Sequence, residues 1–293
     1  MALSGRDIPR PSDIKTYHTE TYARISPKTS GFDGKGKTIV VTGGSAGIGY
    51  SICRAFAEAG VAKIVFTSRS AGPQKEAKEK LKTAYADTKF ETFQASADDL
   101  EAMTRVIQSV GPIDVLVHNA AFSPDQRVPS KDIPASDVLQ TFQTNVIAAY
   151  HMITTYLHAA TPASGEKAII AVSSAAANVY IPQQVAYASS KAALSKMICA
   201  LADEHAPAKD GVRLVSFHPG IIYTAAAAQF VPKEAFEWED LDMTGDFAVW
   251  LAGKESEFLH GRFVWAQWDV DELLALKEKM ANDRSFLKIG LMY

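Results

Sequence analysis

A serine, a tyrosine and a lysine in the middle of the chain have the types and spacing of an acid–base group. Tyr187 and Lys191 are four residues apart in a stretch that predicts a helix, so both side chains project from one helix face. Ser174 lies 13 residues before Tyr187, which is enough chain to leave a strand end, loop back and meet it. A tyrosine, with a pKa of about 10 in water, is a poor acid–base catalyst at neutral pH unless its anion is stabilised. The positive charge of Lys191 would provide that stabilisation. A Tyr-x3-Lys pair alone is a frequent accident, so the rest of the chain must support it.

A cluster of glycines lies between a predicted strand and a predicted helix. Residues 37–42 are mostly β-branched, as in strands buried on both faces, and residues 48–59 have the apolar spacing of an amphipathic helix. Glycines in this position let the backbone approach a pyrophosphate, and the helix N-terminus offers N–H groups and a positive dipole to the phosphates. Glycine-rich turns are common in loops, but one placed here predicts a dinucleotide site. The predicted cofactor-binding residues of the turn are Thr42, Gly43, Ser45, Gly47, Ile48 and Gly49.

The residues that end the second predicted strand, over 63–68, bear on the choice of cofactor. In dinucleotide folds an acidic residue at this point binds the adenosine ribose hydroxyls and favours NAD. Ser68 takes that place here, so the carboxylate that would repel a 2′-phosphate is missing. Arg69 beside it can bind the phosphate through charge-assisted hydrogen bonds. The alternative is that Arg69 is a solvated surface residue. We expect NADP(H) to be preferred over NAD(H).

The remaining chain alternates strand patterns with helix patterns and predicts the scaffold for these groups. Right-handed crossovers would assemble the strands into one doubly wound parallel sheet of about seven strands, with helices on both faces. Ligands bind beyond the carboxyl ends of the strands in such sheets. Candidate residues fall at those ends, while Asn145 lies in the middle of a long predicted helix, an awkward place for asparagine. The predicted strands cover 37–42, 63–68, 89–95, 113–117, 167–172, 211–217 and 262–266, and the predicted helices 48–59, 74–85, 100–110, 137–160, 187–205, 246–252 and 270–280.

The order of these motifs along the chain resembles the short-chain dehydrogenase/reductase family over about residues 36–266. The motifs are, in this order, the glycine turn, Asn-Ala, the helical Asn, the strand-end Ser, Tyr-x3-Lys and Pro-Gly-x3-Thr. The leader and the ending also look like a group of fungal members, mostly of unassigned substrate. The resemblance implies that Tyr187 donates a proton in reduction and accepts one in oxidation, and that Ser174 binds the substrate oxygen. It also implies that Lys191 holds the nicotinamide ribose and that Asn145 anchors a water that relays protons to Lys191.

The same resemblance implies further cofactor contacts. Asn119 would tie the central strands together, and Ala120 and Ala121 would lie against the cofactor. Ile222 and Thr224 would fix the carboxamide. The remaining cofactor residues of this loop are Pro219 and Gly220. The chain departs from the family pattern at two of its positions. Ala121 replaces a glycine and narrows the floor under the nicotinamide ribose. Ser96 replaces the aspartate that reads the adenine, which leaves that contact in doubt.

The domain organisation follows from the extent of the resemblance. Residues 1–35 are polar and predict an irregular N-terminal extension. Residues 36–268 form the dinucleotide-binding domain, including a substrate lid at 225–243, and residues 269–293 form a C-terminal helix and tail. The lid carries Phe230, Phe236 and Trp238, which either cover the substrate or belong to the core. With Tyr180 and Tyr223, they suggest an apolar ketone, aldehyde or alcohol as the substrate, aromatic or polycyclic in character.

Composition and charge exclude several classes of protein. The hydrophobic content of 47% and the charged content of 22% are ordinary for a globular protein. The net charge of −3 gives no reason to expect nucleic acid or an anionic membrane as a partner. The two cysteines, Cys53 and Cys199, fall in predicted helices and are expected to be buried free thiols. With no secretory signal pattern and no apolar span, we expect a cytoplasmic protein without a metal site. The resemblance further implies a homodimer or homotetramer.

Two other functions are compatible with the same motifs. The fold and cofactor can serve a non-redox step, as in an epimerase, a dehydratase or a cyclisation catalyst. The chain can also be a non-catalytic NADP-binding regulator. An intact set of Asn145, Ser174, Tyr187 and Lys191 favours the redox reaction, because a repurposed site is free to lose members.

Overall fold

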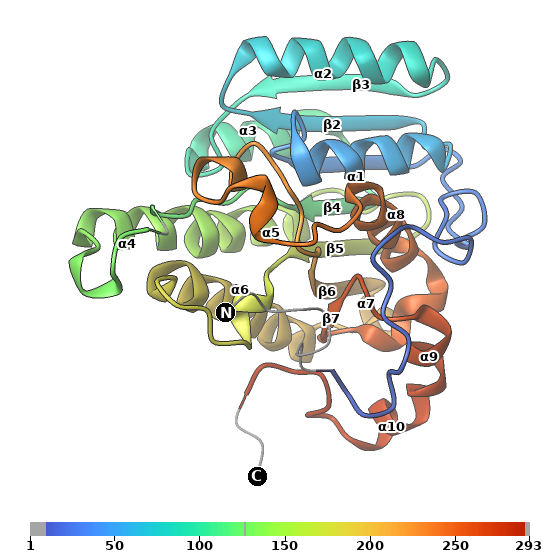
Figure 1. Ribbon diagram of the computed structural model, residues 1–293. Coiled ribbons are helices and arrows are strands. Elements are labelled where there is room, and N and C mark those ends of the chain that lie inside the picture. The colour runs from blue at the N-terminus through green and yellow to red at the C-terminus, as the bar shows by residue number, and fades with distance from the viewer. Residues whose placement is uncertain (1–9, 126, 291–293) are drawn as a thin grey trace.

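Seven parallel strands form the centre of the computed structural model, which describes residues 10–125 and 127–290. Their order is β3-β2-β1-β4-β5-β6-β7, and every neighbouring pair is parallel. The chain therefore builds one half of the sheet outward from β1, then returns past β1 to build the other half (Figure 1). The predicted doubly wound sheet is confirmed. The strands are β1 (Thr38–Thr42), β2 (Lys63–Ser68), β3 (Lys89–Gln94), β4 (Val115–His118), β5 (Lys167–Val172), β6 (Val212–His218) and β7 (Phe263–Trp265).

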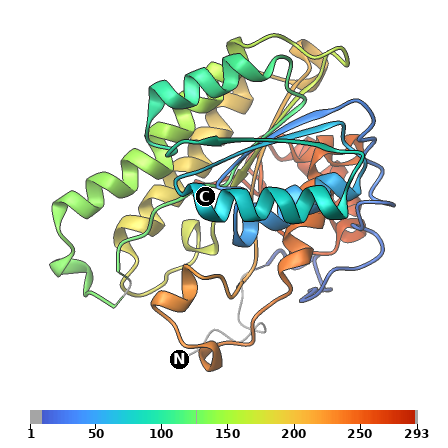
Figure 2. The same ribbon diagram turned by 90° about the horizontal axis from the view of Figure 1, so that it is seen from above.

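Helices cover both faces of the sheet, and Figure 2 shows the two layers with the strands between them. One layer contains α1 (Gly47–Glu58), α2 (Ala71–Ala84) and α8 (Leu241–Ala252). The other contains α3 (Leu100–Val110), α5 (Ala148–His158) and α6 (Val185–Glu204), with α4 (Ala135–Phe142) beyond them. The short helices are α7 (Pro207–Asp210), α9 (Val270–Ala275) and α10 (Lys277–Asn282). Across the described residues, no helix has both the length and the apolar character to cross a membrane.

The β-branched strands fill two cores because successive side chains point to opposite faces of the sheet. In β1, Ile39 and Val41 pack with Phe56 of α1 in one cluster. Val40 packs with Met103 of α3 in the other. All of these side chains are almost completely buried. The continuous apolar run that the sequence shows at 39–41 therefore contributes side chains to both layers.

Three segments differ from the predicted elements. The helix predicted over 137–160 is interrupted by a π-helical turn at Gln143–Ile147, which contains Asn145 and joins α4 to α5. The helix predicted over 270–280 breaks between α9 and α10. The helix predicted at 246 begins earlier, so the last residues of the predicted lid, 241–243, belong to α8. The π-helical turn is of interest because such turns occur frequently at functional sites.

The N-terminal segment, residues 10–35, contains no regular helix or strand in its described part and lies along the C-terminal elements. Its only bridge to the rest of the described chain is antiparallel, between Tyr17 and Trp268. The amides of Lys15 and Thr16 donate to the carboxylate of Glu272 in α9, at 2.6 and 3.0 Å. In Figure 1 this dark-blue segment runs past α8 and α9. It is therefore anchored along its length.

The contact between α1 and α8 depends on a glycine, which gives a test of the packing. A Cβ added to Gly245 would lie 2.5 Å from the carbonyl oxygen of Ser51, whereas one added to Gly72 in α2 would meet nothing within 4 Å. We predict that Gly245→Ala lowers the free energy of unfolding by about 1–3 kcal/mol, because the helices must move apart. Gly72→Ala is the control and should raise it by up to about 1 kcal/mol. Urea unfolding measures both, and equal effects would contradict this packing.

Candidate active site and cofactor groove

The glycine turn brings backbone segments into unusually close contact at the carboxyl end of β1. Gly43 has a positive φ of 70°, a conformation that favours glycine. A Cβ on Gly49 would overlap the carbonyl oxygen of Gly43, so α1 can begin against the turn only without a side chain there. The residue before α1, Ala46, provides no side-chain cap, and the first-turn N–H groups of a helix have no partner within the helix itself. The turn therefore offers free N–H donors at a positive helix end.

Thr42 and Asn119 join β1 to the loop after β4. The Thr42 hydroxyl accepts hydrogen bonds from the backbone amides of Asn119 and Ala120, both at 2.9 Å. The Asn119 side-chain amide donates to the Thr42 carbonyl oxygen, also at 2.9 Å. A Cβ on Gly43 would lie 3.0 Å from that same amide nitrogen. These bonds fix the groove between the two strands, where Ala121 follows as part of a pocket wall.

The loop after β6 closes the groove from the other side. A Cβ on Gly47 would lie 3.2 Å from the Thr224 methyl group, so the glycine turn and this loop face each other. The Thr224 hydroxyl accepts from the amide of Ala227, and the Thr224 amide donates to the Ile222 carbonyl oxygen at 3.0 Å. Gly220 has a φ of 114°, which lets the chain turn directly after Pro219. Predicted cofactor residues that are about 180 positions apart thus lie together across one groove.

This groove fits a nicotinamide dinucleotide. An uncapped helix N-terminus behind a glycine turn suits a pyrophosphate, which carries negative charge and accepts hydrogen bonds. Ser45 and Ile48 belong to the same turn and its first helical residues. Among the described residues no cluster of three His, Cys, Asp or Glu side chains could hold a metal ion.

The end of β2 lies where the adenosine part of such a cofactor is expected. Ser68 is buried and its hydroxyl donates to the Ser70 carbonyl oxygen at 3.0 Å. Arg69 is exposed and contributes to the pocket wall. The Ser96 hydroxyl hydrogen-bonds Asp98, whose pKa is held below its ordinary value mainly by that bond. Ser96 replaces the aspartate of the family pattern, but the carboxylate of Asp98 lies directly beside it.

Ser174, Tyr187 and Lys191 meet at the carboxyl end of β5. Ser174 follows the strand, and α6 begins at Val185, so Tyr187 and Lys191 lie in its first two turns. Ser174 and Tyr187 both line one pocket. Lys191 is 1% exposed, its ammonium group lies 5.7 Å from the Tyr187 ring centre, and it donates to the Val172 carbonyl oxygen at 2.8 Å. The strand end and the helix start thus bring together three groups that the sequence separates.

Burial determines the protonation of this group. It raises the pKa of Tyr187 to about 12, against the lowering effect of a hydrogen bond with Ser174. It lowers the pKa of Lys191 to about 8, because a buried ammonium group loses its hydration. At neutral pH the tyrosine therefore carries its proton and the lysine is charged. A tyrosine in this state can donate a proton.

Asn145 contacts a backbone segment and a serine and not the lysine directly. Its side-chain oxygen accepts from the Phe122 amide at 2.8 Å, and its side-chain nitrogen donates to the Phe122 carbonyl oxygen and the Ser190 hydroxyl, both at 2.9 Å. The side chain is completely buried in the π-helical turn. It therefore fixes the loop after β4 against α6, next to the residue that precedes Lys191.

A pocket of about 600 Å³ opens beside Ser174 and Tyr187. Its walls are predominantly apolar and aromatic, and many of the lining residues lie between β6 and α8. The aromatic and branched side chains include Phe122, Val179, Phe230, Phe236, Trp238 and Trp265. None of Phe230, Phe236 and Trp238 is fully buried, so they line the pocket and are not core residues. Tyr180 is 86% exposed, and Tyr223 packs on Trp238 with ring centres 4.9 Å apart; neither lines the pocket.

Two histidines end strands at the same edge of the sheet. His118 and His218 are buried, and in the described residues neither ring makes a hydrogen bond. Burial lowers the pKa of each to about 3, so both are neutral at physiological pH. His218 lines the pocket and packs edge-on against Trp265, with ring centres 4.6 Å apart.

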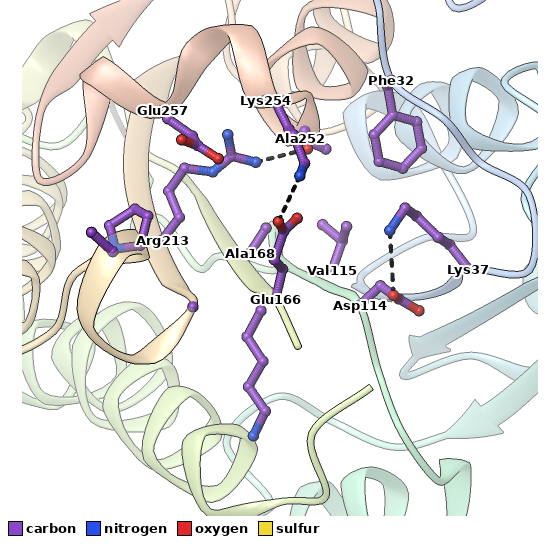
Figure 3. Close-up of a pocket in the computed structure, with 14 residues that line it drawn as sticks. Phe32, Lys37, Asp114, Val115, Glu166, Ala168, Arg213, Ala252, Lys254 and Glu257 are labelled. Carbon is purple, nitrogen blue, oxygen red and sulfur yellow. Dashed lines mark hydrogen bonds and ion pairs between the residues drawn. The ribbon is translucent and has the colours of Figure 1, made fainter. Parts of the chain in front are cut away.

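A second cavity of about 360 Å³ lies near the opposite ends of the strands, and several of its charged side chains have partners (Figure 3). Lys254 binds Glu166 at 2.9 Å, and Lys37 lies 3.5 Å from Asp114. Arg213 is buried and donates to the carbonyl oxygens of Ala252 and Gly253, at the C-terminus of α8. A cation there is favourable because the carbonyl groups of a helix end lack partners within the helix. These contacts give Lys254 and Arg213 structural partners within the chain.

Sequence reasoning missed Glu239, which borders the site. It is 9% exposed and accepts hydrogen bonds from the Ile221 amide and the Gln267 side chain, at 2.8 and 2.6 Å. In the sequence it stands in an acidic stretch, FEWEDLD, in which it looks like any solvated carboxylate. Only the tertiary contacts distinguish it from its neighbours.

Comparison with known proteins gives a consistent result. The family profile described as short chain dehydrogenase matches residues 37–235. The chain is 49% identical to the short chain dehydrogenase/reductase nsrO of Aspergillus novofumigatus, with 97% of each chain covered. It is 47% identical to the short chain dehydrogenase/reductase AacuD of Aspergillus aculeatus, with 95% and 96% covered. Among solved structures, it is similar to a putative NAD(P) dependent gluconate 5-dehydrogenase from Beutenbergia cavernae with bound NADP, at 26% identity and a TM-score of 0.72, covering 81% of this chain and 97% of that one.

The buried charge of Lys191 gives a stability test in the cofactor-free protein. The pKa of Lys191 is about 8 in the folded protein and about 10.5 in the unfolded chain. Protonation of Lys191 therefore favours the unfolded chain, and the folded protein loses stability as the pH falls from about 10.5 through about 8. We predict that the free energy of unfolding of Lys191→Met is about 2 kcal/mol higher than that of the wild type at pH 6. The difference between the two proteins should become smaller as the pH rises toward about 10.5. Lys196→Met, on the exposed side of α6, is the control and should show no such trend. Urea unfolding at several pH values measures this, and a constant gap would contradict it.

Proposed function

This chain belongs to the short chain dehydrogenase family, and we propose that it is an NADP(H)-dependent oxidoreductase. We propose that it interconverts a ketone or aldehyde and an alcohol on an apolar small molecule. The family acts on CH–OH and C=O groups with a nicotinamide cofactor, so the class of reaction follows from membership. The observation that carries the proposal is the meeting of Ser174 and Tyr187 in one pocket wall, with the Lys191 ammonium group 5.7 Å from the tyrosine ring.

The proposed proton transfer uses this chain's own residues. The bound nicotinamide supplies or accepts the hydride. In reduction the Tyr187 hydroxyl gives its proton to the substrate oxygen, and Ser174 donates a hydrogen bond to that oxygen and orients it. Lys191, charged at neutral pH, stabilises the tyrosinate that remains. In oxidation Tyr187 takes the proton back. Asn145 is proposed to support this group by anchoring a water that relays protons to Lys191.

The cofactor is proposed to bind along the groove already described. The N-terminus of α1 and the glycine turn would hold the pyrophosphate, and Lys191 the nicotinamide ribose. Asn119, Ala120 and Ala121 would lie against the cofactor, and Pro219, Gly220, Ile222 and Thr224 would fix the carboxamide. The preference for NADP(H) is supported by Ser68, which places no carboxylate at the end of β2, and by exposed Arg69 beside it. We propose that Arg69 binds the 2′-phosphate.

The pocket supports an apolar substrate, aromatic or polycyclic in character. Aromatic rings from Phe122, Phe230, Phe236 and Trp238 favour flat apolar ligands, because stacked and edge-on ring pairs add to burial of area. Its volume of about 600 Å³ is within the range of small-molecule sites. Residues 225–240 are proposed to act as the lid.

A homodimer or homotetramer is also proposed. Leu139 of α4, Ile147 of the π-helical turn and Tyr150 of α5 are 70%, 47% and 51% exposed, and such apolar residues together favour a protein contact. A cytoplasmic location remains a prediction from the sequence.

The proposed acid–base role of Tyr187 is tested by Tyr187→Phe. We predict that it abolishes consumption of NADPH with aromatic and polycyclic ketones, because the proton donor is gone, while the dissociation constant of NADPH changes less than about threefold. Absorbance of the reduced nicotinamide measures turnover and fluorescence measures binding. Tyr85→Phe, at the end of α2, is the matched control and should retain activity. Retained turnover in Tyr187→Phe would overturn the assignment, and NADPH binding by wild type without consumption of any ketone would favour the non-redox alternatives.

The proposed role of Arg69 is tested by comparing cofactors. We predict that Arg69→Ala weakens NADPH binding by about tenfold or more, the effect of losing charged hydrogen bonds, and leaves NADH binding unchanged. Arg105→Ala is the control, since Arg105 is an exposed arginine on α3 that faces Glu101. Fluorescence titration with both cofactors gives the dissociation constants. Equal binding of NADPH and NADH by the wild-type protein would remove Arg69 from the proposal.

A further inference from the structure

The chain between β6 and α8 closes on itself through two residues. The Ile221 amide donates to the Glu239 carboxylate at 2.8 Å, and the Glu239 amide donates to the Ile221 carbonyl oxygen at 2.9 Å. We call residues 222–238 between them the substrate loop, and Ile221 with Glu239 its neck. Figure 2 shows this orange segment extending away from the sheet. Its two ends are thus held together by reciprocal bonds.

The Glu239 carboxylate is a buried acceptor with three donors around it. The Ile221 amide and the Gln267 side chain donate to one oxygen, and the Tyr17 hydroxyl donates to the other at 3.2 Å. All three are donors, which matches a carboxylate, a group that only accepts when ionised. A Cβ on Gly220 would lie 2.6 Å from the same carboxylate, so the carboxylate packs directly against the start of the loop.

The N-terminal segment holds the neck from outside. Besides the Tyr17 hydroxyl, the Thr19 carbonyl oxygen accepts from the Asp240 amide at 2.8 Å. The His18 amide donates to the Gln267 carbonyl oxygen at 2.8 Å, and Tyr17 bridges Trp268. The family match covers 37–235, so Glu239 and two of its three donors, Tyr17 and Gln267, lie outside the matched part of the chain, whereas Ile221 lies inside it.

Much of the pocket wall belongs to the loop that the neck closes. Phe230, Phe236 and Trp238 all belong to the substrate loop and line the pocket. Away from the neck the loop contacts Arg127, whose guanidinium lies 5.8 Å from the Phe230 ring centre. That contact is exposed and weak compared with the buried bonds at the neck. Opening the neck would therefore let the aromatic wall move while the Ser174, Tyr187 and Lys191 group stays in place.

We propose that Glu239 is a positioning residue for the substrate, which fixes the substrate loop at its neck, and that Tyr17 of the N-terminal segment holds Glu239 in place. The proposal deepens the proposed function, because the position of the loop matters for the binding of an apolar ketone. The state of the loop is also measurable without any substrate.

Four variants separate the neck from its surroundings. Glu239→Ala removes every side-chain bond at the neck. Glu239→Gln is the conservative variant, because its amide oxygen can accept from Ile221 and Gln267 and its amide nitrogen can donate to Tyr17. Tyr17→Phe removes one hydroxyl only. Glu272→Ala is the matched control, since Glu272 binds the same N-terminal segment through Lys15 and Thr16 but does not contact the neck.

Trypsin cleavage after Lys233, an exposed residue of the substrate loop, reports its opening in the presence of NADPH. We expect cleavage about tenfold faster in Glu239→Ala, two- to threefold faster in Tyr17→Phe, and near the wild-type rate in Glu239→Gln and Glu272→Ala. For an aromatic ketone, Glu239→Ala should raise KM by about tenfold and change kcat by less than about threefold, and Glu239→Gln should restore the wild-type KM.

The outcomes separate this proposal from the proposed function. Equal cleavage rates in Glu239→Ala and Glu272→Ala, or no rescue by Glu239→Gln, would overturn the positioning role. A fall in kcat with unchanged KM would also overturn it, because the neck would then act on the chemistry. If no ketone is consumed by any variant but cleavage follows the expected order, the redox function fails while the role of Glu239 in holding the loop is supported.

Discussion

The close approach of backbones at the carboxyl end of β1 is the constraint on which the site depends. Gly49 can lie against the Gly43 carbonyl group only because it has no side chain, and Thr42 and Asn119 lock that approach with buried hydrogen bonds. These contacts fix where α1 begins and therefore where its free N–H groups point. At this edge of the sheet, Asn119 and Ala120 after β4 and Thr224 after β6 all lie in close contact with the glycines of that turn.

Side chains near the amino ends of the strands bind the carbonyl groups at two helix C-termini, and no described side chain caps the N-terminus of α1 at the carboxyl edge. Near the amino ends of the strands, Arg213 and Lys167 donate to the last carbonyl groups of α8 and α5, so those termini are satisfied within the chain. At the carboxyl edge α1 has no side-chain cap. Since buried polar groups are normally paired, groups without partners indicate where a ligand would bind.

The buried Lys191 shows how the proposed function and stability oppose each other. Burial lowers its pKa to about 8, so below that pH its charge is held at a cost in folding free energy. The same burial places that charge near the Tyr187 ring, where in the proposed reaction it would favour the tyrosinate. Close to Lys191, the Asn145 side chain joins the Phe122 backbone to the Ser190 hydroxyl of α6 through three hydrogen bonds.

By itself, the sequence determined the alternating strands and helices and the sheet class, because local periodicity and glycine spacing are sufficient for these. The roles of the candidate residues at strand ends came from the resemblance to a known family. The sequence placed Asn145 in one continuous helix, whereas the structure has a π-helical turn there, in which Asn145 bonds Phe122 and Ser190 from other parts of the fold. It could not distinguish lid from core for Phe230, nor single out Glu239 among neighbouring acids. Those assignments depend on which segments, more than 200 residues apart for Tyr17 and Glu239, come into contact, and only the tertiary structure decides that.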